Sequence, residues 1–294
     1  MHPETITFQI AGFLLAPLML GVINKTKAWF AGRNGAPYLQ PYYDLWKLLQ
    51  KGAVYSSTTT WVFRAGPILT LSAGAAAMLL APIGKAEAPL TFVGDLVLFA
   101  GLLGVMRFAT IVAALDTGSA FEGMGASREA MLSAIAEPAF YLALAALVLV
   151  TGDLTLTGMI GGGSADGWTG ATAPALVLVL GAIFLIMLAE NSRIPIDDPN
   201  THLELTMVHE VMVLDHGGPD LAYILYGVAL KLWLFGTLLV GVAMPFHTGS
   251  VWGDGLVFLA GMMVVAFLVP TCIKQRTYVY SAHGQSSNIH SAER

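Results

Sequence analysis

The chain has 294 residues, of which 56% are hydrophobic and 11% charged, with a net charge of −5 and a mean hydropathy of +0.70. Soluble domains carry about 25% charged residues, so this composition predicts an integral protein of the lipid bilayer and not a nucleic-acid-binding protein. Cys272 is the only cysteine. A single thiol excludes a disulfide within the chain, and it cannot hold an iron–sulfur cluster or a nickel–iron centre, which need several thiolates.

Seven segments are long and apolar enough to cross a bilayer, which predicts an all-α, polytopic membrane helix bundle. The expected spans are 5–24, 64–83, 91–115, 132–151, 174–190, 221–244 and 252–273. The first has no basic leader and no small-residue cleavage site, so we interpret it as an uncleaved span. We expect one integral-membrane domain over residues 1–279 and a polar, flexible tail over residues 280–294.

The connection between the first two spans contains the sequence GRNGAPYLQPYYDLWKLLQKG. Its apolar side chains fall on one face of a helix, and its charged side chains lie elsewhere. This pattern predicts a short amphipathic helix on the cytoplasmic membrane surface. The later connection 152–173 is rich in glycine and lacks the lysine of a phosphate-binding loop, so we expect a flexible loop there.

Basic residues are distributed unevenly between the two sides of the predicted bundle. Eleven of the fourteen lysines and arginines lie in the connections 24–64, 116–131 and 191–220 or in the tail, whereas the opposite connections contain only Lys85. Because cytoplasmic loops are enriched in basic residues, this bias predicts a protein of the cytoplasmic (inner) membrane with its N-terminus outside and its C-terminus in the cytoplasm.

Residues 190–220, ENSRIPIDDPNTHLELTMVHEVMVLDHGGPD, place seven carboxylates and one cation, Arg193, on that cytoplasmic side. Two prolines prevent a continuous helix through the first half. A capping box begins at Thr201 and glycines follow Asp215, which predicts a helix between them that is too short to cross a bilayer. The candidates for proton transfer in this stretch are Glu190, Asp197, Asp198, Glu204 and Glu210.

Three histidines, His202, His209 and His216, recur every seven residues in the same stretch. Ligands separated by about 10 Å along a helix cannot share one metal ion, because each bond to the metal is about 2 Å long. We therefore predict no metal site there and interpret the histidines as surface or proton-buffering groups.

Four ionisable side chains lie within the expected spans or at their inner ends: Arg107, Asp116, Glu137 and Lys231. A charge at the centre of a bilayer costs at least about 2.5–3.5 kcal/mol, so we expect the two cations to pair with the two carboxylates inside the bundle. Such pairs either fix helix packing or form a proton relay with buried, shifted groups. Two further relay candidates share one helical face if the helix is continuous through the glycines between them, Glu122 and Glu129.

The stretch ENSRIPIDDPNTHLELTMVHEVMVLDHGGPDLA resembles the signature of the formate hydrogenlyase and hydrogenase-4 membrane subunit, a member of the energy-converting group 4 NiFe-hydrogenase family. That subunit is homologous to the complex I membrane subunit that borders the quinone chamber. GRNGAPYLQPYYDLWKLLQK and GASREAMLSAIAEPA resemble two of the family's cytoplasmic loops, so the resemblance covers nearly the whole chain. Residues 196–204 follow the hydrogenase pattern, and the eighth span of complex I relatives has no counterpart in this sequence.

The resemblance implies a membrane anchor and coupling subunit that is not catalytic alone and holds no cofactor. Its implied partners are the hydrogenase large and small subunits and an iron–sulfur subunit, which would hold the NiFe and iron–sulfur centres, together with antiporter-like membrane subunits. Electron transfer in the cytoplasmic partners would shift the protonation of the acids and drive proton or sodium translocation. The residues that the resemblance implies in partner docking are Arg33, Asp44, Lys47, Arg128 and Arg193.

Two other functions are consistent with the sequence. The chain could be the quinone-chamber membrane subunit of complex I itself, or a free-standing ion transporter. The absence of an internal repeat argues against a transporter with inverted repeats. Neighbouring genes for hydrogenase subunits would favour the hydrogenase-type coupling subunit. Neighbouring quinone-reductase genes would favour the complex I subunit, and a lone gene would favour the free-standing transporter.

Overall fold

The computed structural model describes residues 3–84, 86–161, 172–191, 208–244 and 250–270. Within these ranges the chain forms helices, and its only extended pairing is an isolated bridge between Ile83 and Ala86. Seven of the helices are long and apolar enough to cross a membrane. The expected all-α membrane bundle with seven spans is therefore confirmed.

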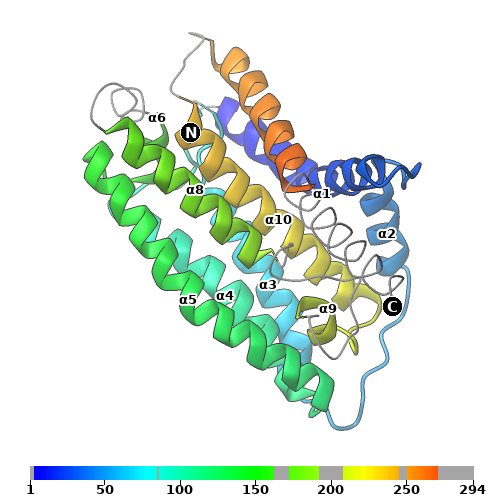
Figure 1. Cartoon of the computed structure of the whole chain (residues 1–294). Helices are drawn as coiled ribbons and strands as arrows, with labels where there is room; N and C mark the ends of the chain where they lie inside the picture. The colour runs from blue at the N-terminus through cyan, green and yellow to red at the C-terminus, as the bar shows by residue number, and fades with distance from the viewer. Residues whose placement is uncertain (1–2, 85, 162–171, 192–207, 245–249, 271–294) are drawn as a thin grey trace, which may run out of the picture.

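The helices follow one another along the chain as labelled in Figure 1: α1 (Pro3–Phe30), α2 (Gln40–Leu49), α3 (Trp61–Leu80), α4 (Asp95–Asp116), α5 (Ala120–Thr151), α6 (Leu156–Gly161), α8 (Ala173–Glu190), α9 (His209–Met212) and α10 (Gly218–Ala243). A last span follows over Val251–Pro270. The helices α2 and α9 lie at one end of the bundle, and α6 lies at the other.

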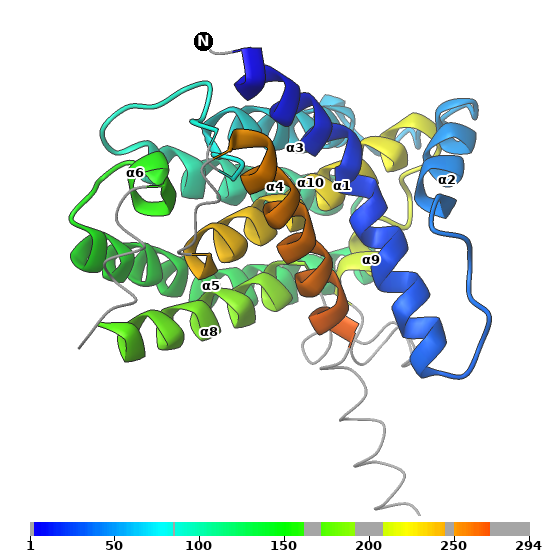
Figure 2. The ribbon, with the colours of Figure 1, turned by 90° about the horizontal axis from the view of Figure 1, so that it is seen from above.

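Helix α10 is the centre of the bundle. Every residue from Ala229 to Val242 is buried, and the helix contacts α1, α2, α3, α6 and α8. Figure 2 shows α10 between the layer of α3 and α4 and the layer of α5 and α8, with α1 and the Val251–Pro270 helix crossing on one side. A helix that is apolar on all sides is expected in such a position, because every face of it packs against another helix.

Helices α3 and α4 pack closely because small residues face each other between them. A Cβ added to Gly66 would lie 2.7 Å from Ala113 Cβ and 3.0 Å from Ala109 O. Further along the same contact, Thr70 Oγ1 donates to Gly66 O at 2.9 Å and lies 3.4 Å from Thr110 Oγ1. The close approach therefore places two hydroxyls inside the bundle.

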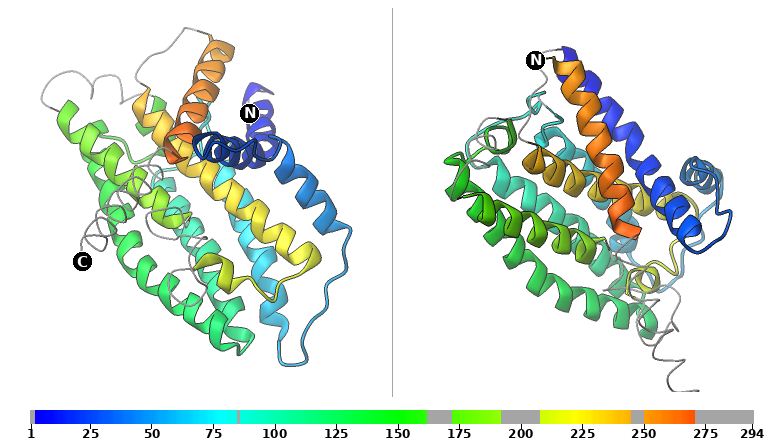
Figure 3. Two further views of the ribbon diagram at one scale, coloured as in Figure 1. Left: turned by 45° about the vertical axis from the view of Figure 1, so that its right-hand side comes forward. Right: turned by 45° about the horizontal axis from the view of Figure 1, so that its top comes forward.

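The amphipathic helix predicted in the first connection is confirmed as α2, which has no buried residue and lies against α1 and α10 at the edge of the bundle (Figure 3). The segment that leads into α2 crosses α1 at Gly21, where an added Cβ would lie 2.0 Å from Tyr38 O. The hydroxyl of Tyr42 donates to Leu14 O on α1. A side chain at position 21 would therefore separate the two segments.

Two predicted connections are wrong in part. The 116–131 loop is mostly helix, because α5 begins at Ala120 and not at residue 132. Gly123 and Gly125 do not break the helix, and Gly125 serves packing: a Cβ there would lie 3.0 Å from Val208 O. The described part of the 152–173 loop contains α6, whose Leu156 and Met159 are buried in the core.

The helix predicted from Thr201 to Asp215 is also different in the structure. Residues 192–207 lie outside the described ranges, and the described part contains only the four-residue helix α9, which ends at Met212. Turn residues follow it up to Asp215. As a result, His209 and His216 do not share the face of one continuous helix.

Candidate functional site

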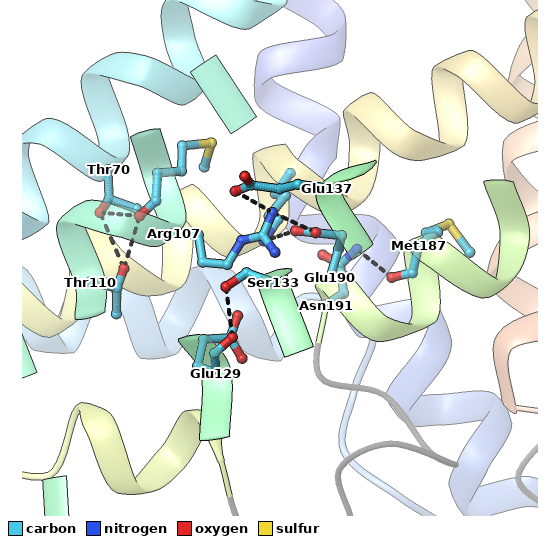
Figure 4. Close-up of polar contacts among 11 residues, drawn as sticks. Thr70, Arg107, Thr110, Glu129, Ser133, Glu137, Met187, Glu190 and Asn191 are labelled. Atoms are coloured by element: carbon cyan, nitrogen blue, oxygen red, sulfur yellow. Dashed lines mark hydrogen bonds and ion pairs between the residues drawn. The ribbon is translucent and has the colours of Figure 1, made fainter. Parts of the chain in front are cut away.

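Four ionisable side chains from four different helices meet inside the bundle, and Figure 4 labels three of them, Arg107, Glu137 and Glu190. Glu190, the last residue of α8, forms ion pairs with both cations: its Oε1 lies 2.6 Å from Arg107 Nη2 of α4, and its Oε2 lies 2.7 Å from Lys231 Nζ of α10. Arg107 Nη2 also lies 3.4 Å from Glu137 Oε1 of α5. We call these four residues the ion-pair cluster.

Burial differs sharply within the ion-pair cluster. The side chains of Arg107, Glu190 and Lys231 are 6%, 3% and 8% exposed, whereas that of Glu137 is 47% exposed. Gly104 leaves room for Glu137 on α4, since a Cβ there would lie 3.3 Å from Glu137 Oε1. The cluster therefore carries two positive and two negative charges and reaches the protein surface only through Glu137.

Desolvation explains why these charges are gathered in one place. An isolated charge inside a membrane bundle is costly, and mutual attraction offsets that cost only where the partners are close and well placed. Glu190 meets this condition for both cations at once. The prediction that Arg107 pairs with Glu137 is confirmed.

The prediction that Asp116 pairs with a buried cation is wrong. Asp116 ends α4 and accepts from the N-terminus of α3: its carboxylate lies 2.7 Å from Thr60 N, 2.8 Å from Thr60 Oγ1 and 3.3 Å from Phe63 N. These donors are the free groups of a helix start, which favour a carboxylate. Lys231 pairs instead with Glu190, which sequence reasoning assigned to the acidic connection.

A small cavity adjoins the ion-pair cluster. Its volume is about 20 Å³, enough for one water molecule, which needs about 10–15 Å³ of such space and several polar partners. The polar residues that line it are Thr70, Arg107, Thr110, Glu129, Glu190, Asn191, His209 and Lys231. The cavity therefore connects Glu190 with Glu129 of α5 and with His209 of α9.

Sequence reasoning missed three of these lining residues: Thr70, Thr110 and Asn191. Thr110 Oγ1 donates to Met106 O at 3.1 Å, and Asn191 Nδ2 donates to Met187 O at 2.8 Å. Such bonds to the preceding turn are common for polar residues in apolar helices. The only signal in the sequence was the presence of polar side chains within or next to the apolar spans. That signal is weak, because most such side chains only bond to a carbonyl of their own helix.

Glu122 and Glu129 both lie on the buried face of α5, as expected for a continuous helix, and are 1% and 4% exposed. Their surroundings differ. Glu129 lines the cavity beside the ion-pair cluster, whereas Glu122 Oε1 accepts from Asp215 N at 3.0 Å and so holds the turn after α9. Of the two carboxylates, therefore, only Glu129 shares a cavity with the buried cations.

His216 lies in an apolar contact next to the start of α3. Its ring stacks on Phe63 with 3.9 Å between the ring centroids and 5° between the planes. Burial lowers the pKa of His216 from 6.5 to about 4, although the carboxylates of Asp220 and Asp215 act in the opposite direction. His216 is therefore neutral at physiological pH and does not act as a surface buffer.

A second contact network lies beside His216. The neighbouring Asp220 carboxylate raises the pKa of the Tyr55 hydroxyl. The Arg64 guanidinium lies 4.2 Å from the centroid of the Tyr55 ring. These contacts fix the segment before α3 against the start of α10.

The predicted docking residues are accessible at the end of the bundle that carries α2. Arg33, Asp44 and Lys47 are exposed, and Arg128 is half-buried on α5. Glu210 is exposed on α9. The remaining candidates lie outside the described residues: Arg193, Asp197, Asp198, Glu204 and His202.

Known proteins resemble this chain in sequence and in fold. The family model described as NADH dehydrogenase matches residues 4–277. The chain belongs to this family. Formate hydrogenlyase subunit 4 of Escherichia coli (strain K12) is 30% identical over 257 residues, which cover 87% of this chain and 80% of that protein. Hydrogenase-4 component C of the same strain is 31% identical over 233 residues, covering 79% and 72%.

More distant members of the NADH dehydrogenase family include a subunit of the NADH-quinone oxidoreductase of Anaplasma phagocytophilum (strain HZ), 28% identical over 69% of this chain and 67% of that protein. A chain of the membrane-bound sulfane sulfur reductase, an archaeal respiratory membrane complex, superimposes with a TM-score of 0.75. It is 19% identical, and the match covers 91% of this chain and 87% of that chain, so it supports the fold. This chain is thus a multi-pass membrane subunit whose relatives work in multisubunit complexes.

Proposed function

We propose that the chain is the membrane anchor and ion-coupling subunit of a group 4 NiFe-hydrogenase-type complex, similar to formate hydrogenlyase. In this proposal, electron transfer in cytoplasmic partners is linked to proton or sodium translocation through the ion-pair cluster. The observation that carries the proposal is the double pairing of Glu190 with Arg107 and Lys231, next to a water-sized cavity.

The chemistry of the ion-pair cluster supports proton movement. Glu190 contacts both cations, so a proton arriving at its carboxylate would weaken both ion pairs at once. Glu137 then offers a second acceptor, 3.4 Å from the shared Arg107. Protonation of one carboxylate therefore changes the other through the guanidinium, which is the coupling that a relay requires.

A route to the cytoplasmic end follows from the cavity lining. Glu129 and His209 share the cavity with Glu190, and Glu210 is the exposed neighbour of His209. We propose that protons enter at the acidic stretch and pass through these groups to the ion-pair cluster. The acids of residues 192–207 belong to the same proposed entrance.

Partners and location belong to the same proposal. The exposed residues around α2 and α9 would dock the hydrogenase large and small subunits and the iron–sulfur subunit, and antiporter-like subunits would pack beside the spans. The NiFe and iron–sulfur centres would lie in those partners, because the single Cys272 cannot hold them. The basic residues near α2 support a cytoplasmic orientation of this end in the inner membrane.

Conservative replacements of carboxylates test the relay. Glu137→Gln and Glu210→Gln keep shape and hydrogen bonding but remove a proton-accepting group, and Glu87→Gln, at an exposed site outside the spans, is the matched control. We expect complex yield to stay normal in all three. Ions pumped per electron should fall in the first two and be restored in part by Asp at the same positions.

A purely structural role gives the opposite result. Assembly would then suffer, and any complex that forms would pump at the unmodified ratio. Full assembly with an unchanged ratio in both Gln variants would remove these positions from the relay.

A second candidate is the quinone-chamber subunit of a quinone reductase, which the relatives from NADH-quinone oxidoreductases favour. Identifying the chains that co-purify in mild detergent distinguishes the two. Hydrogenase subunits support the first function, and quinone-reductase subunits support the second.

A further inference from the structure

A cavity of about 210 Å³ lies between α1, α10 and the Val251–Pro270 helix, on the half of the bundle where α1 begins. Its walls are apolar and include Phe8 and Leu15 of α1 and Phe258 of the last span. Two aromatic contacts frame it: Phe8 with Trp252 at 5.3 Å and Trp233 with Phe258 at 6.2 Å between ring centroids. No residue of the ion-pair cluster lines this cavity.

One hydrogen-bond donor faces this space without a partner. Trp233 is 3% exposed, and its indole Nε1 has no hydrogen-bond acceptor among the atoms of the structure. A Cβ added at Gly12, which also lines the cavity, would lie 3.0 Å from that Nε1. The indole Nε1 therefore borders the volume left by the missing side chain.

Water is a poor occupant of this cavity. A buried water molecule needs two to four polar partners, and apolar cavities of this kind stay dry or take up apolar molecules. The lining supplies the Trp233 donor and Thr7 near the start of α1, but is otherwise apolar. The occupant must fill an apolar space and present one acceptor, since a buried N–H without a partner is costly.

The cavity opens toward the lipid. Trp252 and Leu256, which lie on its rim, are 60% and 70% exposed. Their helix is a membrane span, so these side chains lie where bilayer lipids contact the bundle. The volume is below the roughly 300–1,000 Å³ of sites that enclose a drug-sized ligand, which favours one extended chain inserted from outside.

We propose that this cavity binds a bilayer phospholipid. One acyl chain fills the space between the three helices, and an ester carbonyl of the same lipid accepts the hydrogen bond from Trp233 Nε1. The lipid completes the packing between α1 and the last span at a place where the protein alone leaves a gap. The site does not depend on ion coupling or on the partner subunits.

Photo-crosslinking of the full chain in proteoliposomes tests the proposal. The probe is a phosphatidylcholine with a diazirine in one acyl chain, diluted into phosphatidylethanolamine and phosphatidylglycerol. Ala11→Phe fills the cavity from α1, and Ala260→Phe adds the same ring on an exposed part of the last span outside the lining. We expect about a tenfold lower label on Gly12 and Phe258 in the first variant and no change in the second.

A separate measurement covers the case in which Ala11→Phe does not fold. Trp233→Phe keeps an aromatic ring and removes only the N–H, and native mass spectrometry counts the phospholipids retained by each chain in detergent. We expect one tightly held phospholipid in the unmodified chain and in Ala260→Phe, and its loss at a severalfold lower detergent concentration in Trp233→Phe.

Three results would overturn the proposal. The first is equal labelling of Gly12 and Phe258 in the Ala11→Phe and Ala260→Phe chains. The second is equal lipid retention in the Trp233→Phe chain. The third is displacement of the label by an isoprenoid quinone at a low ratio to lipid, which would assign the cavity to a quinone.

Discussion

The carboxylates of two regions of this protein are satisfied in different ways. In the ion-pair cluster, Glu190 is bound by the side chains of two cations. At the end of the bundle that carries α9, Asp116 and Glu122 accept instead from backbone N–H groups of α3 and of the turn at Asp215. Lys231 can exchange a proton with the Glu190 carboxylate, whereas the Arg107 guanidinium and backbone amides keep their protons.

Because of this difference, carboxylates of the same chemical type have different roles: some can take part in proton transfer, and others hold the structure together. Glu190 is surrounded by titratable groups and a water-sized cavity, so a change in its protonation alters the charges around it. Asp116 and Glu122 fix helix ends and a turn, so their loss should alter geometry first. The two regions should therefore respond differently to mutation and to pH.

The largest effect is expected for Glu190→Ala. This change leaves Arg107 with only the partly exposed Glu137 and Lys231 without its carboxylate, and removing one partner of a buried pair typically costs about 3–5 kcal/mol. The free energy of unfolding, measured by SDS titration in mixed micelles, should fall by that amount. Glu137→Ala should cost clearly less, because its side chain is 47% exposed; equal losses would contradict the comparison.

A smaller effect is expected from pH in the region of Asp116 and Glu122. His216 has a pKa of about 4 in the folded chain against 6.5 when unfolded, so the unfolded chain binds the proton first. The free energy of unfolding should fall as pH drops from about 6.5 to about 4, by up to about 3 kcal/mol. His216→Gln should lose this contribution and His209→Gln should keep it, which thermal unfolding at several pH values would measure.

The smallest effect is expected for Asp116→Ala. The change removes the carboxylate acceptor at the start of α3, and the loss of such a capping group costs about 0.5–2 kcal/mol. Thr60 Oγ1 still accepts from Val62 N in the variant, which limits the loss. Pumping per electron should be unchanged; reduced pumping at full assembly would place Asp116 with the ion-pair cluster.

The spans and one ion pair could be predicted from the sequence because both follow from the cost of polar groups in a bilayer. That cost requires long apolar helices and requires Arg107 to find a carboxylate. It does not specify which carboxylate is nearest. Asp116 lies at the end of α4, whereas Lys231 lies in the middle of α10, and the helix start at Thr60 offers Asp116 donors.

The location of Glu190 and the length of α9 could not be predicted from the sequence, because both depend on contacts between distant parts of the chain. Glu190 follows an apolar run and precedes a polar one, so the sequence places it at a boundary without showing which side it faces. The helix around His209 ends at Met212, and Gly125 of α5 admits Val208 and Met212 at close range, a contact between distant parts of the chain. Local patterns such as a capping box do not contain that information.

The central position of α10 has a consequence for biogenesis. This helix contacts α1 and α3, which enter the membrane more than a hundred residues earlier in synthesis. Until α10 inserts, the faces of those spans that later surround it are open to lipid, and Glu190 lacks the lysine that it later binds. The insertion of α10 therefore both fills the space between the earlier spans and brings a positive charge to a carboxylate that was already in the membrane.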